Sequence, residues 1–284
     1  MANDLPKTEL QLITDAIGAH GVYFKKALRS KLEGLVGVKI LGEEYPVRYL
    51  EGASIDLLVE FNGEHERFVI PIECKRALVS AKTWIFFKDE HSNIKFLYSF
   101  IGANLNVKSS GSVGLNSTIC VEGIEVDSAK LRNPKGPYSA ASADNIWKAA
   151  FQACKGGLGF VLTELQTRQK TASTPVFNFA MSNFNVFLIV VTTAPLKIAE
   201  LPAGSVDLAT GTHVGGLSLQ EVPWLTLHYP FTPATSLGIN HLEVNTPHYL
   251  DPSQRGLHGK EGIIFVNVQY IERFFELLRA QRPS

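Results

Sequence analysis

The sequence is poor in cysteine, has no long apolar run and carries no excess of either charge. Only three of its 284 residues are cysteines, and none stand in a C-x-x-C spacing, which argues against a zinc knuckle and for a reducing compartment. The longest apolar run, VFLIVVTTA, is too short to cross a bilayer. The N-terminal stretch MANDLPKTEL holds no apolar signal-peptide core. We therefore expect a cytoplasmic protein that does not bind a membrane.

Charge is balanced overall but unevenly distributed along the chain. The 27 basic and 27 acidic residues cancel, so there is no global basic field that would attract nucleic acid without specificity. Residues 75–155, however, hold 11 Lys/Arg and 6 Asp/Glu, whereas residues 1–74 hold 8 and 12. The imbalance is either accidental or marks an anionic ligand near the segment that begins at Lys75. Both interpretations stay open at this point.

Apolar periodicity predicts one mixed α/β domain without a clear internal linker. A segment rich in Gly, Ser and Asn over residues 101–144 predicts short strands and loops. The expected helices lie at 6–34 (interrupted near Gly18 and Gly21), 145–168 (weakened in the middle by Gly156 and Gly157) and 270–281, and the expected strands at 38–50 (bent at Gly42 or Pro46), 54–61, 68–77, 185–196, 222–231 and 262–269.

The runs SIDLLVEF and FVIPIECKRA predict a β-hairpin, because Asn62-Gly63 in the polar NGEHER segment between them is a strong turn signal. Paired residues of an antiparallel hairpin lie at equal distances from its turn, and the midpoint between Asp56 and Glu73 falls inside NGEHER. These two carboxylates are therefore expected to face each other, with β-carbons about 4.5–5.5 Å apart. Lys75 shares the face of Glu73, since side chains alternate along a strand.

Two facing carboxylates repel, and one of them acquires a raised pKa unless a cation lies between them. Mg²⁺ suits this place, because it takes oxygen ligands and needs only one or two carboxylates besides water and substrate phosphate. A lysine beside a metal-bound water can orient that water and offset charge developing on a phosphate. The alternative is an exposed ion pair of Glu73 and Lys75 on an edge strand, worth under about 1 kcal/mol.

Asp56 in SID and Glu73 in ECK are separated by 16 residues. This combination resembles the motif of the PD-(D/E)XK nuclease superfamily. The resemblance implies a restriction-endonuclease-like fold, in which a mixed β-sheet is flanked by helices. Its core runs in the order helix, three strands with the acids on the second and third, helix, strand. In this chain the implied core covers about 20–75 and 145–195, with an inserted lobe at about 76–144 and a C-terminal extension at about 196–284, all in one domain.

The resemblance also implies roles for individual residues. Asp56, Glu73 and the backbone carbonyl of Cys74 would hold Mg²⁺, with Lys75 at the attacking water. The later segment NIWKAAFQACKGG is similar to the family's second helix, where an A-x-x-Q pattern directs a glutamine to the site, and Ala149 and Gln152 fit that pattern. Trp147, Lys148 and Lys155 lie nearby and are placed to meet a phosphate backbone.

Two positions depart from the family pattern. Ile55 stands where the motif has proline, and Lys25 stands where many members carry a glutamate of the first helix. Glu9 and Glu33 are the candidate replacements for that glutamate.

The function that follows from the resemblance is Mg²⁺-dependent hydrolysis of DNA phosphodiesters, with Mn²⁺ able to substitute and Ca²⁺ binding without turnover. A restriction or other prokaryotic defence nuclease is the first expectation, acting as a homodimer or with a partner subunit. A DNA repair or junction-resolving nuclease is one alternative. A catalytically idle nuclease fold, serving as a DNA-binding or scaffold subunit, is another, which the lysine at position 25 leaves open.

Other chemistries find less support in the sequence. The GxSxG, HExxH and Walker A motifs are absent. The aromatic side chains of Trp224, Tyr229 and Phe231 are expected to pack in the core or in loops rather than to stack on nucleic-acid bases.

Overall fold

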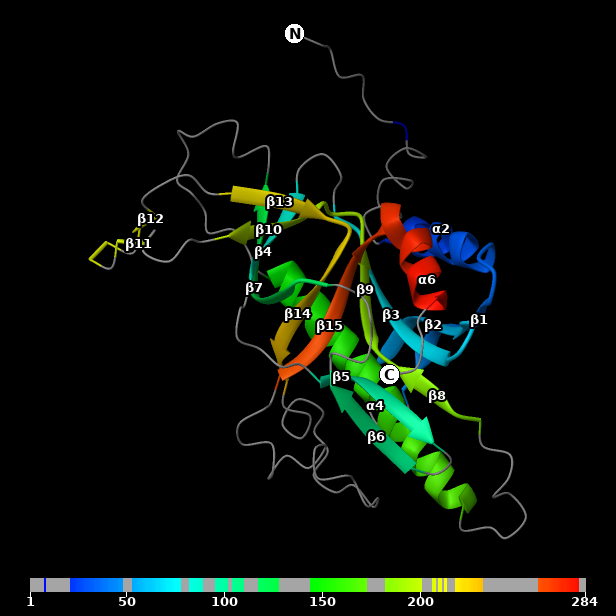
Figure 1. The fold of residues 1–284 in the computed structure, drawn as a ribbon. Helices are drawn as coiled ribbons and strands as arrows, with labels where there is room; N and C mark the ends of the chain where they lie inside the picture. The colour runs from blue at the N-terminus through cyan, green and yellow to red at the C-terminus, as the bar shows by residue number, and fades with distance from the viewer. Residues whose placement is uncertain are drawn as a thin grey trace.

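The structure is a computed structural model that describes residues 8, 21–47, 53–77, 82–88, 95–101, 104–109, 117–127, 144–172, 182–200, 206–207, 209–210, 212–213, 218–231 and 260–280. Thirteen of its described strands form one mixed sheet, with helices packed on both faces (Figure 1). The expected α/β class is therefore confirmed.

The element bounds are as follows. The helices are α2 (Val22–Glu33), α4 (Asp144–Ala172), the 3₁₀ helix η2 (Val268–Tyr270) and α6 (Ile271–Arg279). The strands of the sheet are β1 (Val38–Pro46), β2 (Ser54–Asn62), β3 (Arg67–Lys75), β4 (Lys82–Lys88), β5 (Lys95–Ile101), β6 (Asn104–Ser109), β7 (Ile119–Asp127), β8 (Phe184–Val186), β9 (Leu188–Thr192), β10 (Leu196–Glu200), β13 (Ser218–Val222), β14 (Trp224–Pro230) and β15 (Lys260–Asn267). Two short strands, β11 (Val206–Asp207) and β12 (Thr212–His213), pair only with each other.

The sheet branches beside β3. Strands β1, β2 and β3 are successively antiparallel, and β3 is parallel to both β8 and β9, which are separated by Phe187 alone. From β8 the sheet continues through β5 to β6, and from β9 it continues through β15, β14, β7, β4 and β10 to β13. The strand expected at 185–196 thus corresponds to β8 and β9, with β10 beginning at its last residue.

The predicted hairpin is confirmed as β2 and β3. Asn62 pairs with Arg67 across the turn, and Leu57 pairs with Ile72. The expected bend at Gly42 is also confirmed, because the register of β1 against β2 shifts between Ile40 and Gly42.

Helix α4 is continuous through Gly156 and Gly157, so the expected weakness in its middle is wrong. Close packing explains both glycines. A β-carbon at Gly157 would lie 2.1 Å from Cδ2 of Leu188 on β9, and one at Gly156 would lie 3.1 Å from Cγ1 of Ile55 on β2. The helix can approach the sheet this closely only without side chains here, and the burial gained outweighs the low helix propensity of glycine.

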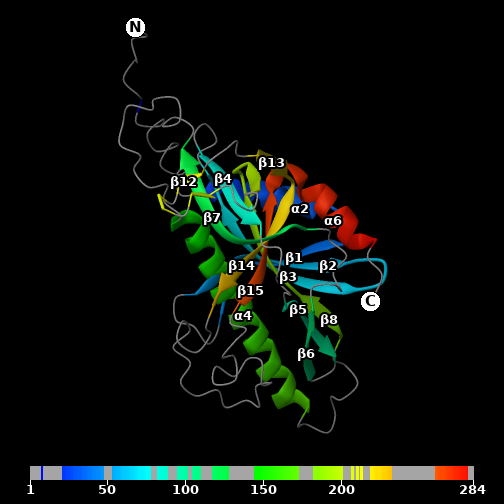
Figure 2. The same cartoon turned by 60° about the vertical axis from the view of Figure 1, so that its left-hand side comes forward.

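The two faces of the sheet carry separate cores. Leu28 and Leu32 of α2 pack with Phe274 and Phe275 of α6 on one face, and α4 covers the other (Figures 1 and 2). Helix α2 starts after Gly21, whose φ of 76° is left-handed backbone. The predicted helical segment before Gly21 lies outside the described residues apart from residue 8.

The segments expected as an inserted lobe and a C-terminal extension contribute described strands to this same sheet. Strands β4 to β7 come from residues 76–144, and β10, β13, β14 and β15 from residues 196–284. The described part of the first segment therefore enlarges the sheet, where the sequence suggested a lobe of its own. None of the described helices is both long and apolar enough to cross a membrane.

Candidate active site

Asp56 and Glu73 lie opposite each other where the β2–β3 pairing ends. The last pair of the ladder is Leu57 with Ile72, so the next pair in that register is Asp56 with Glu73. The hairpin register predicted from the sequence is therefore confirmed. On β3, Val69 shares the face of Glu73 and belongs to the core under α4, and on β2 both Ile55 and Leu58 belong to that core. Glu73 lies on the face that α4 covers, whereas Asp56 follows Ile55, which packs under α4, and lies near Lys25 of α2.

The Asp56 carboxylate is held in place by the backbone of the neighbouring strand. Its Oδ2 accepts a hydrogen bond of 2.8 Å from the N–H of Cys74, and its Oδ1 lies 3.6 Å from Nζ of Lys25. The side chain is 22% exposed. Asp56 is thus fixed in orientation while part of the carboxylate remains accessible.

The Glu73 carboxylate is buried, with its side chain 8% exposed, and Oε1 lies 3.0 Å from Nζ of Lys75. Burial and, after it, the negative charge of Asp56 together raise the pKa of Glu73 to about 7, against the opposing effects of Lys75 and Lys25. The site therefore binds a proton near neutral pH in the absence of another cation. A buried ion pair of this kind excludes the alternative of an exposed edge-strand pair.

Cys74, which stands between Glu73 and Lys75, is not a candidate nucleophile. Burial, followed by the charges of Asp56 and Glu73, raises the pKa of its thiol well above the usual value. The thiol therefore stays protonated at physiological pH, and the thiolate is the reactive form.

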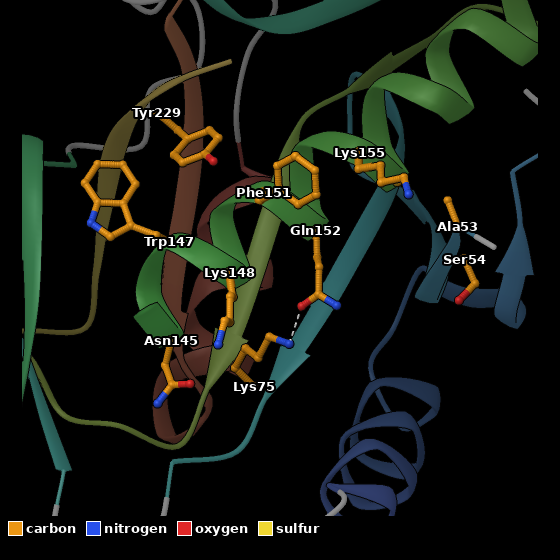
Figure 3. A pocket seen from close by; sticks show the side chains of 11 residues that line it. Ala53, Ser54, Lys75, Asn145, Trp147, Lys148, Phe151, Gln152, Lys155 and Tyr229 are labelled. Carbon is orange, nitrogen blue, oxygen red and sulfur yellow. Dashed lines mark hydrogen bonds between the residues drawn. The ribbon is translucent and has the colours of Figure 1, made fainter. Parts of the chain in front are cut away.

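Lys75 connects the carboxylates to α4. Besides Glu73, its Nζ donates a hydrogen bond to Oε1 of Gln152 (Figure 3). Gln152, expected from the A-x-x-Q pattern, therefore does lie at this site. The structure brings together all four residues that the sequence suggested, Asp56, Glu73, Lys75 and Gln152.

A cleft of about 680 Å³ opens beside this group, between the start of α4, the end of β3 and β14 (Figure 3). Its lining side chains are mainly basic and aromatic, with no acid among the described residues: Ala53, Ser54, Lys75, Asn145, Trp147, Lys148, Phe151, Gln152, Lys155, Gly156 and Tyr229. The three lysines that line the cleft all fall within the basic segment 75–155. Glu73 instead lines a smaller adjoining hollow, and Gln152 lines both. The Lys75–Gln152 pair thus stands between the cleft and Glu73.

The sequence did not predict the acid that approaches the site from β1. Glu44 pairs with Lys25, and its Oε2 accepts a 2.9 Å hydrogen bond from Oγ of Ser54. Its φ of 44° is left-handed backbone, which is costly for a residue other than glycine. Glu33 does not replace the family glutamate, since it pairs with Arg29 at 2.8 Å, and Glu9 lies outside the described residues.

The donor set fits Mg²⁺. Within the part of the chain that the structure describes, no three His, Cys, Asp or Glu side chains converge on one point. Two facing carboxylates suffice for Mg²⁺, which keeps several waters and also binds substrate phosphate. A divalent cation would offset the repulsion that contributes to the raised pKa of Glu73.

Of the three aromatic residues expected to pack in the core or in loops, Trp224 and Phe231 are buried. Tyr229 also packs against the core, but it is half-buried and lines the cleft. No periodicity in the sequence separates Tyr229 from its buried neighbours, because its position depends on β14 lying beside α4.

Comparisons of the chain with protein-family models, with curated proteins and with solved structures found no match in any of the three. Any function proposed for the chain therefore depends on its own residues and geometry.

Proposed function

We propose that this protein is a PD-(D/E)XK-type nuclease that hydrolyses DNA phosphodiesters with the help of Mg²⁺. One observation carries the proposal. Asp56 and Glu73 face each other from adjacent strands, with Lys75 3.0 Å from Glu73 and next to a cleft free of acids among its described lining residues. Two carboxylates and a lysine are the groups that metal-assisted attack of water on a phosphate requires.

The order of elements supports the restriction-endonuclease-like fold. Helix α2, strands β1 to β3, helix α4 and strand β9 occur along the chain in the order that the resemblance implies, with β4 to β7 inserted before α4 and β8 before β9. The acids lie on the second and third of these strands, and β9 pairs with β3 in the parallel sense.

The residues have separate roles in this proposal. Asp56, Glu73 and the carbonyl of Cys74 would hold Mg²⁺, which when bound polarises the phosphate and acidifies a water molecule. Lys75 orients the attacking water and offsets charge that develops on the phosphate. Gln152 fixes the Lys75 ammonium through its hydrogen bond, so that the lysine is oriented before substrate arrives.

A nucleic acid is the proposed substrate because phosphates would meet Lys148 and Lys155 along the cleft, and DNA is the nucleic acid that the resemblance implies. A restriction or other prokaryotic defence role is our first proposal within this class. Strands β4 to β7 extend the sheet beyond the elements that carry the site, and such added surface is where target recognition would be built.

A cleavage assay tests the proposal. Plasmid, linear and branched DNA are incubated with Mg²⁺ or Mn²⁺ and either the wild type, Glu73→Ala or Lys75→Ala, each checked for folding by circular dichroism. We expect the wild type to cut and both variants to lose activity. Cutting that persists in a folded Glu73→Ala variant would contradict the assignment of the site.

One observation favours the alternative that the fold is a catalytically inactive nuclease. The Lys25 ammonium lies 3.6 Å from Oδ1 of Asp56, where it supplies positive charge without any metal. If Lys25 has replaced the ion, the wild type will bind neither Mg²⁺ nor Mn²⁺ and will cut no DNA, and the fold would then serve as a DNA-binding or scaffold subunit.

A further inference from the structure

One wall of the cleft is aromatic. Trp147 and Phe151 occupy positions i and i+4 on α4 and so lie on one face of the helix. The ring of Trp147 is 5.3 Å from that of Tyr229 on β14 (Figure 3). The ring of Phe151 is 5.9 Å from that of Phe231. Phe231 is 1% exposed and supports the wall from behind.

This wall is open to the cleft rather than sealed in the core. Phe151 is 36% exposed, and Trp147 and Tyr229 are half-buried. The chain's other two tryptophans, Trp84 and Trp224, are only 1% and 8% exposed. The core is filled by other aromatic residues, so these accessible rings are not needed to complete it. Accessible aromatic rings beside a candidate active site form a surface on which a flat ligand can stack.

The remaining lining supplies positive charge at a suitable spacing. Lys148 and Lys155 lie two helical turns apart on α4, a rise of about 10.5 Å, and Lys75 comes from β3. No described residue that lines the cleft carries negative charge. A strand of phosphates along α4 would thus meet lysines while its bases meet the aromatic wall.

The size of the cleft favours an unpaired strand. Its volume of about 680 Å³ is that of a pocket for a small organic ligand. Such a space accepts a short stretch of unstacked nucleotides, whereas a double helix keeps its bases stacked inside and would offer the wall nothing to stack on. Proteins that hold single strands combine a basic groove with aromatic side chains in this way.

We propose that the cleft binds the bases of an unpaired DNA strand next to the phosphodiester that is cut, so that the substrate is single-stranded or locally unpaired DNA. The placement of the cut rests on the proposed nuclease function, whereas the binding of the strand does not. Each stacked base contributes about 1–3 kcal/mol in such sites and shows little sequence preference.

Intrinsic fluorescence tests the inference, because Trp147 is the accessible tryptophan among the three. The full chain is titrated with a short oligothymidylate and with a blunt duplex of equal length, in Ca²⁺ and in EDTA. We expect the single strand to quench the fluorescence and the duplex to bind at least about tenfold more weakly. Equal binding of the two, or no quenching by the single strand, would overturn the inference.

Variants separate stacking from folding. We expect Trp147→Ala to weaken oligothymidylate binding about tenfold, measured by anisotropy of a labelled strand. Trp147→Phe keeps an aromatic face and should bind nearly as the wild type does. Leu277→Ala, at an exposed position of α6, serves as the matched control. Wild-type affinity in a folded Trp147→Ala variant would overturn the inference.

Salt dependence gives a second readout. Removing one lysine that binds a phosphate of the single strand should reduce the slope of log affinity against log salt by about 0.7. Lys148→Ala should do so, and Lys170→Ala, at an exposed position near the end of the same helix, should not. An unchanged slope in Lys148→Ala would contradict the proposed path of the phosphates along α4.

The outcomes also separate this inference from the nuclease proposal. Cutting of duplex DNA that depends on Glu73, with no binding of the single strand, would leave the nuclease standing and overturn the inference. Binding and quenching by the single strand, with no metal-dependent cutting of any DNA, would uphold the inference about the cleft and contradict the nuclease.

Discussion

The carboxylate of Glu73 lies 3.0 Å from the ammonium of Lys75 and opposite that of Asp56, in a place where only 8% of its side chain is exposed. Lysine alone does not compensate for this burial, because the pKa of Glu73 is still raised to about 7. The metal-free site therefore costs stability whenever Glu73 is ionised, and a divalent cation would offset that cost.

Replacing Glu73 by glutamine should stabilise the metal-free protein above pH 7. The pKa of Glu73 is about 7 in the folded state against 4.5 for the free side chain, so the folded state holds the proton more tightly. The free energy of unfolding of the wild type then falls as pH rises from about 4.5 through 7, by up to about 3 kcal/mol. Glu73→Gln removes this fall.

Urea unfolding at pH 5 and pH 8 in EDTA measures the difference. We expect the gain in stability of Glu73→Gln over the wild type to be larger at pH 8 than at pH 5. Glu64→Gln, at an exposed position in the turn of the same hairpin, should show no such change. The same gain at both pH values would mean that Glu73 is ionised throughout.

Removing the charge of Lys25 should strengthen metal binding. Its ammonium lies 3.6 Å from Oδ1 of Asp56 and repels an incoming cation, an effect of about 1–4 kcal/mol for charges at this separation near a protein surface. Lys25→Met should therefore raise Mn²⁺ affinity about tenfold in calorimetry. Lys26→Met, exposed on the same helix, is the control, and a loss of affinity in Lys25→Met would contradict the prediction.

Lys75 and Gln152 should differ in their effects on the chemical step. Lys75→Met removes the group that orients water and should lower kcat at least about a hundredfold. Gln152→Ala removes only the hydrogen bond that fixes the lysine and should lower kcat about tenfold. Single-turnover cleavage at saturating enzyme measures both, with Lys170→Met as a control on the same helix. A Gln152→Ala effect as large as that of Lys75→Met would assign Gln152 a direct role.

The contact of α4 with β9 should be sensitive to one methyl group. Gly157→Ala places a β-carbon 2.1 Å from Cδ2 of Leu188, so the helix or the leucine has to move, at a cost of about 1–3 kcal/mol. This exceeds the gain of about 1 kcal/mol from replacing a helical glycine. Chemical denaturation should show a net loss of stability in Gly157→Ala. The double variant with Leu188→Ala should lose less stability than the sum of the two single losses, because the smaller side chain relieves the clash. A more stable Gly157→Ala variant would contradict the close packing.

The hairpin that carries the acids could be predicted from the sequence, because its turn and its alternation are local. The Asn62-Gly63 signal locates the hairpin, although Asn62 itself pairs with Arg67 and residues 63–66 form the turn. The observed register, continued by one pair, brings Asp56 opposite Glu73. The sequence gives a wrong prediction for the glycines of α4 for the opposite reason. Helix propensity is local, but the space beside Gly157 is set by a strand more than 30 positions later.

Other parts of the site depend on packing that no local pattern encodes. Glu44 reaches Lys25 only because β1 shifts register near Gly42 and its own backbone turns left-handed. Tyr229 joins the cleft because the sheet order places β14 beside α4, a consequence of pairing between strands far apart in the sequence.

The measurement that tests the central claim most directly is Mn²⁺ binding by calorimetry to the wild type, Asp56→Asn, Glu73→Gln and the control Glu64→Gln. We predict that the wild type and the control bind Mn²⁺ alike and that each of the two site variants, while folded, loses at least about tenfold in affinity. A wild type that binds no Mn²⁺, or site variants that bind it as well as the control does, would contradict the claim that these two carboxylates form a metal site.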